Sequence, residues 1–166
     1  MLNVQVEIRR FVDGDWPGVW EILHSVIEAG DTYEYPPGAS AAEGRALWLV
    51  APPAEVWVAV DGGRVLGSYK IGANRIGLAD HVANGSYIVS TEARGRGVGR
   101  ALGEHSLLRA RELGFAAMQF NAVVSTNTSA LRLWRSLGFI IVGTVPNGFR
   151  HSRFGLVDFH IMHRFL

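Results

Sequence analysis

The chain has 166 residues, of which 48% are hydrophobic and 19% charged, and its formal net charge is +1. This length and composition predict a single domain, residues 1–166, with a proper hydrophobic core, and the near-neutral charge gives no global field that would attract nucleic acid. The complete lack of cysteine excludes disulfides, thiolate metal sites and any reaction through a covalent cysteine intermediate.

The N-terminus is predicted to begin with a strand. Val4, Val6 and Ile8 alternate with polar residues, as in a half-buried strand, and the first ten residues lack the pattern of a signal peptide. No apolar run reaches membrane-spanning length. We therefore expect a cytoplasmic protein without a membrane partner.

Two helices are expected next. Asp15 is placed to cap the first, with Pro17 near its first turn, and Gly30 ends it. After an irregular loop over 31–39, Ser40 to Glu43 form a capping box for a shorter helix that runs through Leu49.

The rest of the chain alternates strands with helices. Residues 56–60 and 64–71 read as a hairpin around the turn Asp61-Gly62-Gly63, and a loop over 72–83 leads to a strand over 85–90. The later elements follow in order: a helix over 98–113, a strand over 115–124, a helix from about Asn127 that ends at Gly138, and strands over 139–145 and 157–165.

Residues 94–100, Arg-Gly-Arg-Gly-Val-Gly-Arg, are the most informative stretch. Three glycines let the backbone pass close to a ligand, and the free N–H groups and dipole of the following helix favour a negative charge. The three arginines add positive charge. A phosphate loop of the Walker type would need a Gly-Lys-Ser/Thr ending, and a dinucleotide fingerprint would need an acidic residue about twenty positions on; both are missing here. The stretch indicates a site for another pyrophosphate ligand.

A second segment, residues 127–139, has an asparagine before a helix that ends in Gly138-Phe139. Together with the Arg-x-x-Gly-x-Gly pattern of residues 94–99, it resembles the two coenzyme A segments of the GNAT (GCN5-related) N-acetyltransferases. The resemblance implies an α/β fold, with a mixed, twisted sheet of about seven strands and helices on both faces. It also implies acetyl-CoA as cosubstrate and direct transfer of the acetyl group to a small-molecule amine.

In that family, acetyl-CoA lies where the strand before the glycine-rich loop and the strand after the long helix splay apart. The resemblance assigns these residues to acetyl-CoA: Ile88, Val89, Arg94, Gly95, Arg96, Gly97, Val98, Gly99, Arg100, Asn127, Ala130 and Trp134. No metal is expected, since the C-terminal histidines lack a carboxylate and ligand spacing.

Two positions depart from the family pattern. Many members carry a tyrosine, the acid for the leaving sulfur, where this chain has Trp134, and some carry a glutamate base where it has Asn84. An amide is no base at neutral pH, and an indole does not give its proton to a thiolate. Either the base lies elsewhere, or water takes the proton, or the amine binds already neutral.

Asn84 and Asn121 are candidates for orienting the acceptor, because they sit on strands that should flank the cleft. They can equally be a strand-start residue and a satisfied core amide. Residues 120–127 and 130–134 also resemble fungal N-acetyltransferases that detoxify proline analogues such as azetidine-2-carboxylate, in which matching asparagines hold the acceptor.

The loop after the first helix supplies further candidates. By the same resemblance, Tyr33 and Tyr35 form a wall of the acceptor pocket, while Glu34 is either a base or a solvated carboxylate. Dimerisation is common in the family, so we expect a homodimer with its C-terminal strand at the edge. Two other functions stay open: an acetyl-CoA-binding sensor or pseudo-enzyme, and a peptide or protein N-acetyltransferase.

Overall fold

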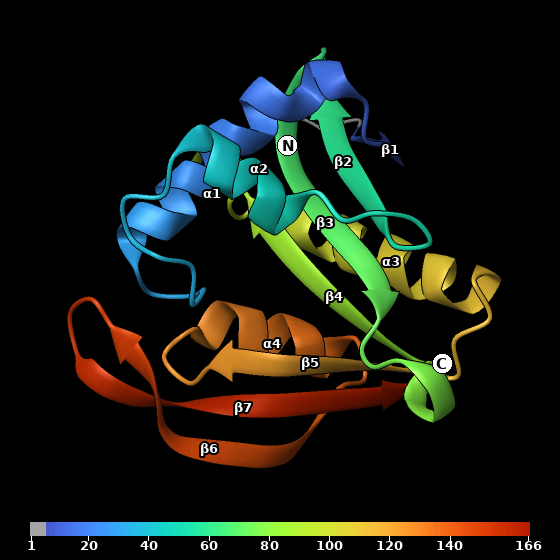
Figure 1. Cartoon of the computed structure of the whole chain (residues 1–166), viewed down its shortest axis with the longest axis vertical. Coiled ribbons are helices and arrows are strands. Elements are labelled where there is room, and N and C mark those ends of the chain that lie inside the picture. Colours follow the sequence, from blue (N-terminus) through green and yellow to red (C-terminus); the bar gives the residue numbers. More distant parts are fainter. Residues whose placement is uncertain (1–5) are drawn as a thin grey trace.

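The computed structural model describes residues 6–166, and its centre is one seven-stranded sheet of order β1-β2-β3-β4-β5-β7-β6 (Figure 1). The strands are β1 (Glu7–Arg10), β2 (Glu55–Asp61), β3 (Arg64–Ala73), β4 (Val82–Val89), β5 (Ala117–Val124), β6 (Ile140–His151) and β7 (Gly155–Phe165). Neighbouring strands are antiparallel except β4 and β5, which are parallel. The expected mixed sheet is therefore confirmed.

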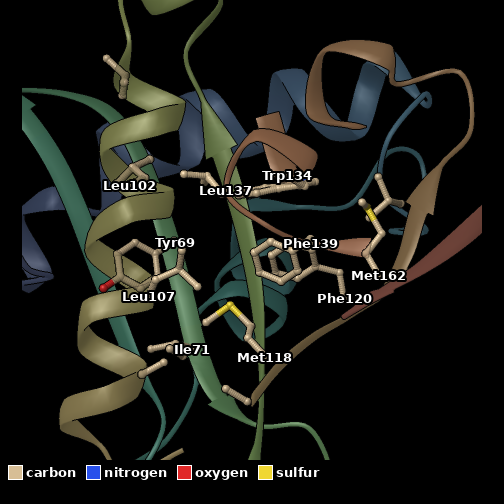
Figure 2. Packing of buried hydrophobic residues seen from close by; sticks show 14 of the residues in the cluster. Tyr69, Ile71, Leu102, Leu107, Met118, Phe120, Trp134, Leu137, Phe139 and Met162 are labelled. Carbon is tan, nitrogen blue, oxygen red and sulfur yellow. The ribbon is translucent and has the colours of Figure 1, made fainter. Parts of the chain in front are cut away.

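Helices cover both faces of the sheet, also as expected: α1 (Trp16–Ala29), α2 (Ala41–Trp48), α3 (Val98–Glu112) and α4 (Thr128–Ser136). On one face, α1 and α2 bury Leu23 and Trp48 against Val58 of β2 and Ile88 of β4. On the other, α3 and α4 bury side chains such as Leu102 in a second cluster with strand residues (Figure 2). These faces are called the α1 side and the α3 side below.

The two parallel strands separate soon after they meet. β4 and β5 pair only at Val82 with Ala117 and at Ala83 with Met118. Beyond this point the strands diverge, and their carboxyl ends are the two arms of a V (Figure 1). Helix α3 follows one arm and α4 the other, so the two segments singled out in the sequence both lie at this opening.

Most of the helix-end signals act as expected. Ser40 accepts a hydrogen bond from Glu43 N at the start of α2, and Gly30 and Gly138 have the left-handed φ values of 60° and 86° that end α1 and α4. Asp15 is a correction. It stands at the N-cap position of α1, but its carboxylate binds Arg9 and Val12 N and makes no capping hydrogen bond to α1.

Several boundaries differ from the sequence expectation. β4 begins at Val82, because its first residues pair with the end of β3, so the expected loop over 72–83 is shorter. Val4 lies outside the described residues, and the first strand is Glu7–Arg10. The C-terminal strand β7 is not an edge strand, since it pairs with both β5 and β6.

None of the helices between Val6 and Leu166 is long and apolar enough to cross a membrane.

Candidate active site

A cleft with a volume of about 820 Å³ lies in the V between β4 and β5. Its walls come from the ends of both strands, the start of α3, the first turns of α4, the loop after α1 and the turn between β6 and β7. Nearly all of the residues predicted from the sequence to hold a ligand line it. Arg96 and Tyr35 are the exceptions.

The glycine-rich loop has the backbone that an anion site requires. Gly95 and Gly97 have φ values of 73° and 83°, a region that residues with a Cβ rarely adopt. The first backbone hydrogen bond within α3 runs from Ala101 N to Gly97 O, 2.9 Å. The N–H groups of the preceding helical residues, Val98 to Arg100, are therefore available to a ligand at the positive end of the helix dipole.

The three arginines of this loop do not act alike. Arg94 and Arg100 line the cleft, and Arg100 also donates to Ser136 Oγ of α4 at 2.7 Å. The guanidinium of Arg96 instead lies 3.5 Å from the carboxylate of Asp61, outside the cleft lining. Because Asp61 is the last residue of β2, this ion pair fastens the loop to the sheet.

The edge of β4 offers backbone hydrogen bonds to the cleft. Ser90 N donates to Leu66 O and Asn74 N to Val82 O, so the even-numbered residues of β4 direct their backbone groups to β3. The N–H and C=O groups of Gly85, Tyr87 and Val89 therefore face the other way, toward the cleft. Since β5 has already diverged, it leaves these groups to other partners.

Tyr33 occupies the middle of that edge. Its hydroxyl donates to Tyr87 O and accepts from Tyr87 N, both at 2.8 Å, and burial raises the pKa of this phenol. One side chain thus joins the loop after α1 to β4. Tyr35 does not line the cleft. It stacks on the Tyr33 ring at 5.2 Å, and burial raises the pKa of Tyr35 to about 12.

Asn84 and Asn121 both line the cleft, but their amides are already engaged. Asn84 Nδ2 donates to Gln119 O at 3.0 Å across the beginning of the V. Asn121 accepts from Gln119 Nε2 at 3.0 Å and donates to Asn74 Oδ1 at 2.7 Å. Within the described range, Asn84 Oδ1 has no protein donor, so it is left to accept from a ligand. Glu34 lines the cleft with an exposed side chain.

On the α3 side, the cleft wall is aromatic. Trp134 is buried, and its ring lies 4.7 Å from the ring of Phe120 (Figure 2). It also lies 4.7 Å from the ring of Tyr87. Asn127 caps α4, because its Oδ1 accepts from Ala130 N. Trp134 therefore packs in the wall of the cleft. Its aromatic contacts explain why a tryptophan stands at this position, and no role in proton transfer is needed.

Local sequence patterns did not single out the turn between β6 and β7 as part of the site. Arg153 and Phe154 of this turn line the cleft together with His151, the last residue of β6. Ser152 fastens this turn to the end of α1, with its N–H 2.9 Å from Gly30 O and its hydroxyl 2.7 Å from Ala29 O. These partners are more than 120 residues apart in sequence, and for this reason no local signal predicts the contact.

Among residues 6–166, no group of three or more histidine and acidic side chains is arranged to hold a metal ion.

Comparison with known proteins agrees with this geometry. The sequence model of the acetyltransferase (GNAT) family matches residues 16–139. The chain is 36% identical over 98 residues to the N-acetyltransferase aca1 of Schizosaccharomyces pombe, a region that covers 58% of this chain and 47% of aca1. This chain thus spans about half the length of that relative.

Two solved structures are similar over nearly the whole chain. A GCN5-related N-acetyltransferase from Kribbella flavida is 45% identical, with a TM-score of 0.93, and the match covers 97% of this chain and 98% of that one. A phosphinothricin acetyltransferase from Sinorhizobium meliloti, solved in complex with acetyl-CoA, is 28% identical, with a TM-score of 0.85 and coverage of 97% and 88%.

Proposed function

This chain belongs to the acetyltransferase (GNAT) family, and from that premise we propose that it transfers an acetyl group from acetyl-CoA directly to a small amino acid or a related small amine. The observation that carries the proposal is the V-shaped cleft. It has an anion-binding loop on its α3 side and a closed, polar pocket on its α1 side.

Acetyl-CoA fits the α3 side of the cleft by its chemistry. The N–H groups at the start of α3 and the guanidinium groups of Arg94 and Arg100 suit a pyrophosphate. The outward backbone groups of Val89 suit the amides of a pantetheine chain. When bound, acetyl-CoA supplies the acetyl group as a reactive thioester.

A small acceptor is favoured because two hydrogen-bonded bridges restrict the α1 side of the cleft. The hydrogen bonds of Ser152 to Ala29 and Gly30 join the β6–β7 turn to α1, and the Tyr33 bridge joins the loop after α1 to β4. An extended peptide would need an open groove through this region. The closure therefore supports a small molecule over a protein N-terminus.

Different residues around the acceptor would position it and take up its proton. Asn84 Oδ1 is free to accept a hydrogen bond from the amine, and the exposed carboxylate of Glu34 can take up the proton that the amine loses. Asn121 supports Asn84 through Gln119. Trp134 supplies packing, so the sulfur leaves without a phenolic acid beside it.

The test is thiol release from acetyl-CoA with a panel of small amines and one peptide. We expect turnover with an amino acid or a cyclic secondary amine, a large rise in KM for that acceptor in Asn84→Ala, and an unchanged Kd for coenzyme A. Tight coenzyme A binding without turnover of any acceptor would refute the proposal and favour an acetyl-CoA sensor. Turnover of the peptide alone would favour a protein acetyltransferase.

A homodimer remains part of the proposal. Strand β6, not the C-terminal strand, is one of the two edge strands of the described sheet, and it carries the exposed side chains of Ile140 and Val142. An unpaired edge with exposed apolar groups is a surface that a second copy can cover. Light scattering on the purified chain would give twice the monomer mass if this is correct.

A further inference from the structure

The outward backbone groups of β4 form a row along the cleft, and Tyr33 interrupts that row. Val89 is the member beside the start of α3, where a Cβ added at Gly99 would lie 3.8 Å from Val89 Cγ2. Tyr87 follows two residues farther into the cleft, and the Tyr33 hydroxyl binds both its N–H and its C=O at 2.8 Å. A ligand chain that comes from the anion-binding loop and pairs with Val89 therefore meets the Tyr33 phenol next.

Tyr33 is a stiff obstacle at this place. Its ring stacks on Tyr35 with a centroid separation of 5.2 Å and meets the ring of Trp48 edge-on at 6.3 Å. Trp48 itself is fully buried, so the ring behind Tyr33 has no room to recede. To move the phenol away, a ligand would have to break two hydrogen bonds and separate this aromatic packing.

The inner end of the cleft is also closed. Asn84 Nδ2 donates to Gln119 O at 3.0 Å and so joins β4 to β5 where the V begins. The phenol of Tyr87 fills the space above Gly85, since a Cβ added there would lie 2.6 Å from the Tyr87 hydroxyl. That hydroxyl lies 2.8 Å from Ser106 Oγ of α3, which holds it in place.

The α3-side wall gives no further room. Trp134 and Phe120 are only 7% and 4% exposed, and their rings lie 4.7 Å apart (Figure 2). Helix α3 supports the wall from behind, because a Cβ added at Gly103 would lie 3.1 Å from Trp134 Cζ3. A chain that runs inward along β4 thus ends in a short space bounded by Tyr33, this wall and the Asn84 bridge.

We propose that Tyr33 sets the length of the acyl group, so that the enzyme accepts acetyl-CoA and rejects longer acyl donors such as butyryl-CoA. The inference rests on the proposed function and specifies its acyl donor. The acyl group ends the pantetheine chain, so it is the part of the ligand that reaches the Tyr33 phenol. A methyl group leaves the bridge from Tyr33 to Tyr87 intact, whereas two more methylenes need the space that the phenol occupies.

The test compares the Kd values of acetyl-CoA and butyryl-CoA, measured calorimetrically without an acceptor. In an open apolar pocket, the two extra methylenes would tighten binding by about tenfold. We expect the opposite in the wild type, with butyryl-CoA bound at least about tenfold more weakly than acetyl-CoA. Tyr33→Ala removes the phenol, so this variant should bind butyryl-CoA at least as tightly as acetyl-CoA.

Matched variants separate this role from a loosened loop. Tyr35→Ala deletes the stacked ring, which does not line the cleft, and it should keep the preference for acetyl-CoA. Tyr33→Phe keeps its ring and loses only the two hydrogen bonds, so its ratio of Kd values should lie between those of the wild type and Tyr33→Ala. Coenzyme A without an acyl group should bind to all of these proteins with Kd values within about twofold.

Equal binding of the two donors by the wild type, an unchanged preference in Tyr33→Ala, or an equal loss of preference in Tyr35→Ala would each overturn the inference. The proposed function is tested separately by thiol release with the panel of amines. Turnover of an amine with butyryl-CoA as efficient as with acetyl-CoA would uphold acyl transfer and refute the limit set by Tyr33.

Discussion

Removal of one hydroxyl group tests how the pocket is built. Tyr33→Phe deletes the group that donates to Tyr87 O and accepts from Tyr87 N, both at 2.8 Å. The ring itself stays, with its stack on Tyr35 at 5.2 Å and its edge contact with Trp48 at 6.3 Å. The substitution therefore removes two hydrogen bonds and preserves the aromatic packing.

The expected cost follows from those two bonds. Each neutral hydrogen bond contributes about 0.5–1.5 kcal/mol, so the unfolding free energy should fall by roughly 1–3 kcal/mol. In a chain of this size, 1 kcal/mol corresponds to about 2–4 °C in Tm, which gives a decrease of roughly 2–12 °C. Because the hydroxyl also fastens the loop that lines the pocket, KM for the acceptor should rise about fivefold or more.

Thermal unfolding and steady-state kinetics measure both effects. Tyr35→Phe is the control, since it makes the same chemical change in the stacked ring, and its hydroxyl has no hydrogen-bond partner in the described structure. Coenzyme A affinity should be unchanged in both variants. A Tm for Tyr33→Phe within 1 °C of that for Tyr35→Phe would show that the bridge does not hold the loop, and the reasoning would be refuted.

Two further substitutions test the sheet and the anion-binding loop. Glu55 accepts hydrogen bonds from Arg109, Trp57 and Arg10, and these contacts, that of Arg109 first, lower its pKa from 4.5 to about 2. That difference in pKa stabilises the folded state by about 3 kcal/mol. The stabilisation is present above pH 4.5 and is lost as the pH falls toward 2. Glu55→Gln should thus be less stable by this amount at pH 7 in urea unfolding, with a gap that narrows in acid; a gap independent of pH would contradict the assignment. Gly97→Ala puts a Cβ at a φ of 83° in open space, so it should cost about 1–2 kcal/mol through the backbone and weaken coenzyme A binding. Gly114→Ala, at a φ of 84° beyond the other end of α3, should lose similar stability and keep coenzyme A affinity, and equal affinities in the two variants would argue against the loop as the binding site.

Local interactions explain what the sequence by itself determined. Helix ends depend on residues within one turn, so Ser40, Gly30 and Gly138 could be identified from their neighbours alone. The anion-binding loop is equally local, because glycine spacing and the start of one helix define it. The fold class followed from the resemblance of residues 94–99 and 127–139 to the GNAT coenzyme A segments, which are also local patterns.

The tertiary structure decided everything that depends on distant partners. Asp15 looked like a cap for α1, yet its carboxylate binds Arg9, six residues earlier in the chain. For Asn84 and Asn121 the sequence left both an acceptor-orienting and a structural role open, and only the structure shows that Gln119 and Asn74 hold their amides.

The pocket itself is the clearest case. Tyr33 meets Tyr87 across 54 residues, and Ser152 meets Ala29 across 123. Neither contact can be predicted from sequence periodicity or composition, because each is made by a single hydrogen-bonding side chain on an irregular segment. The sequence therefore located the glycine-rich loop, whereas only the folded chain brought the loop after α1 and the β6–β7 turn together at one cleft.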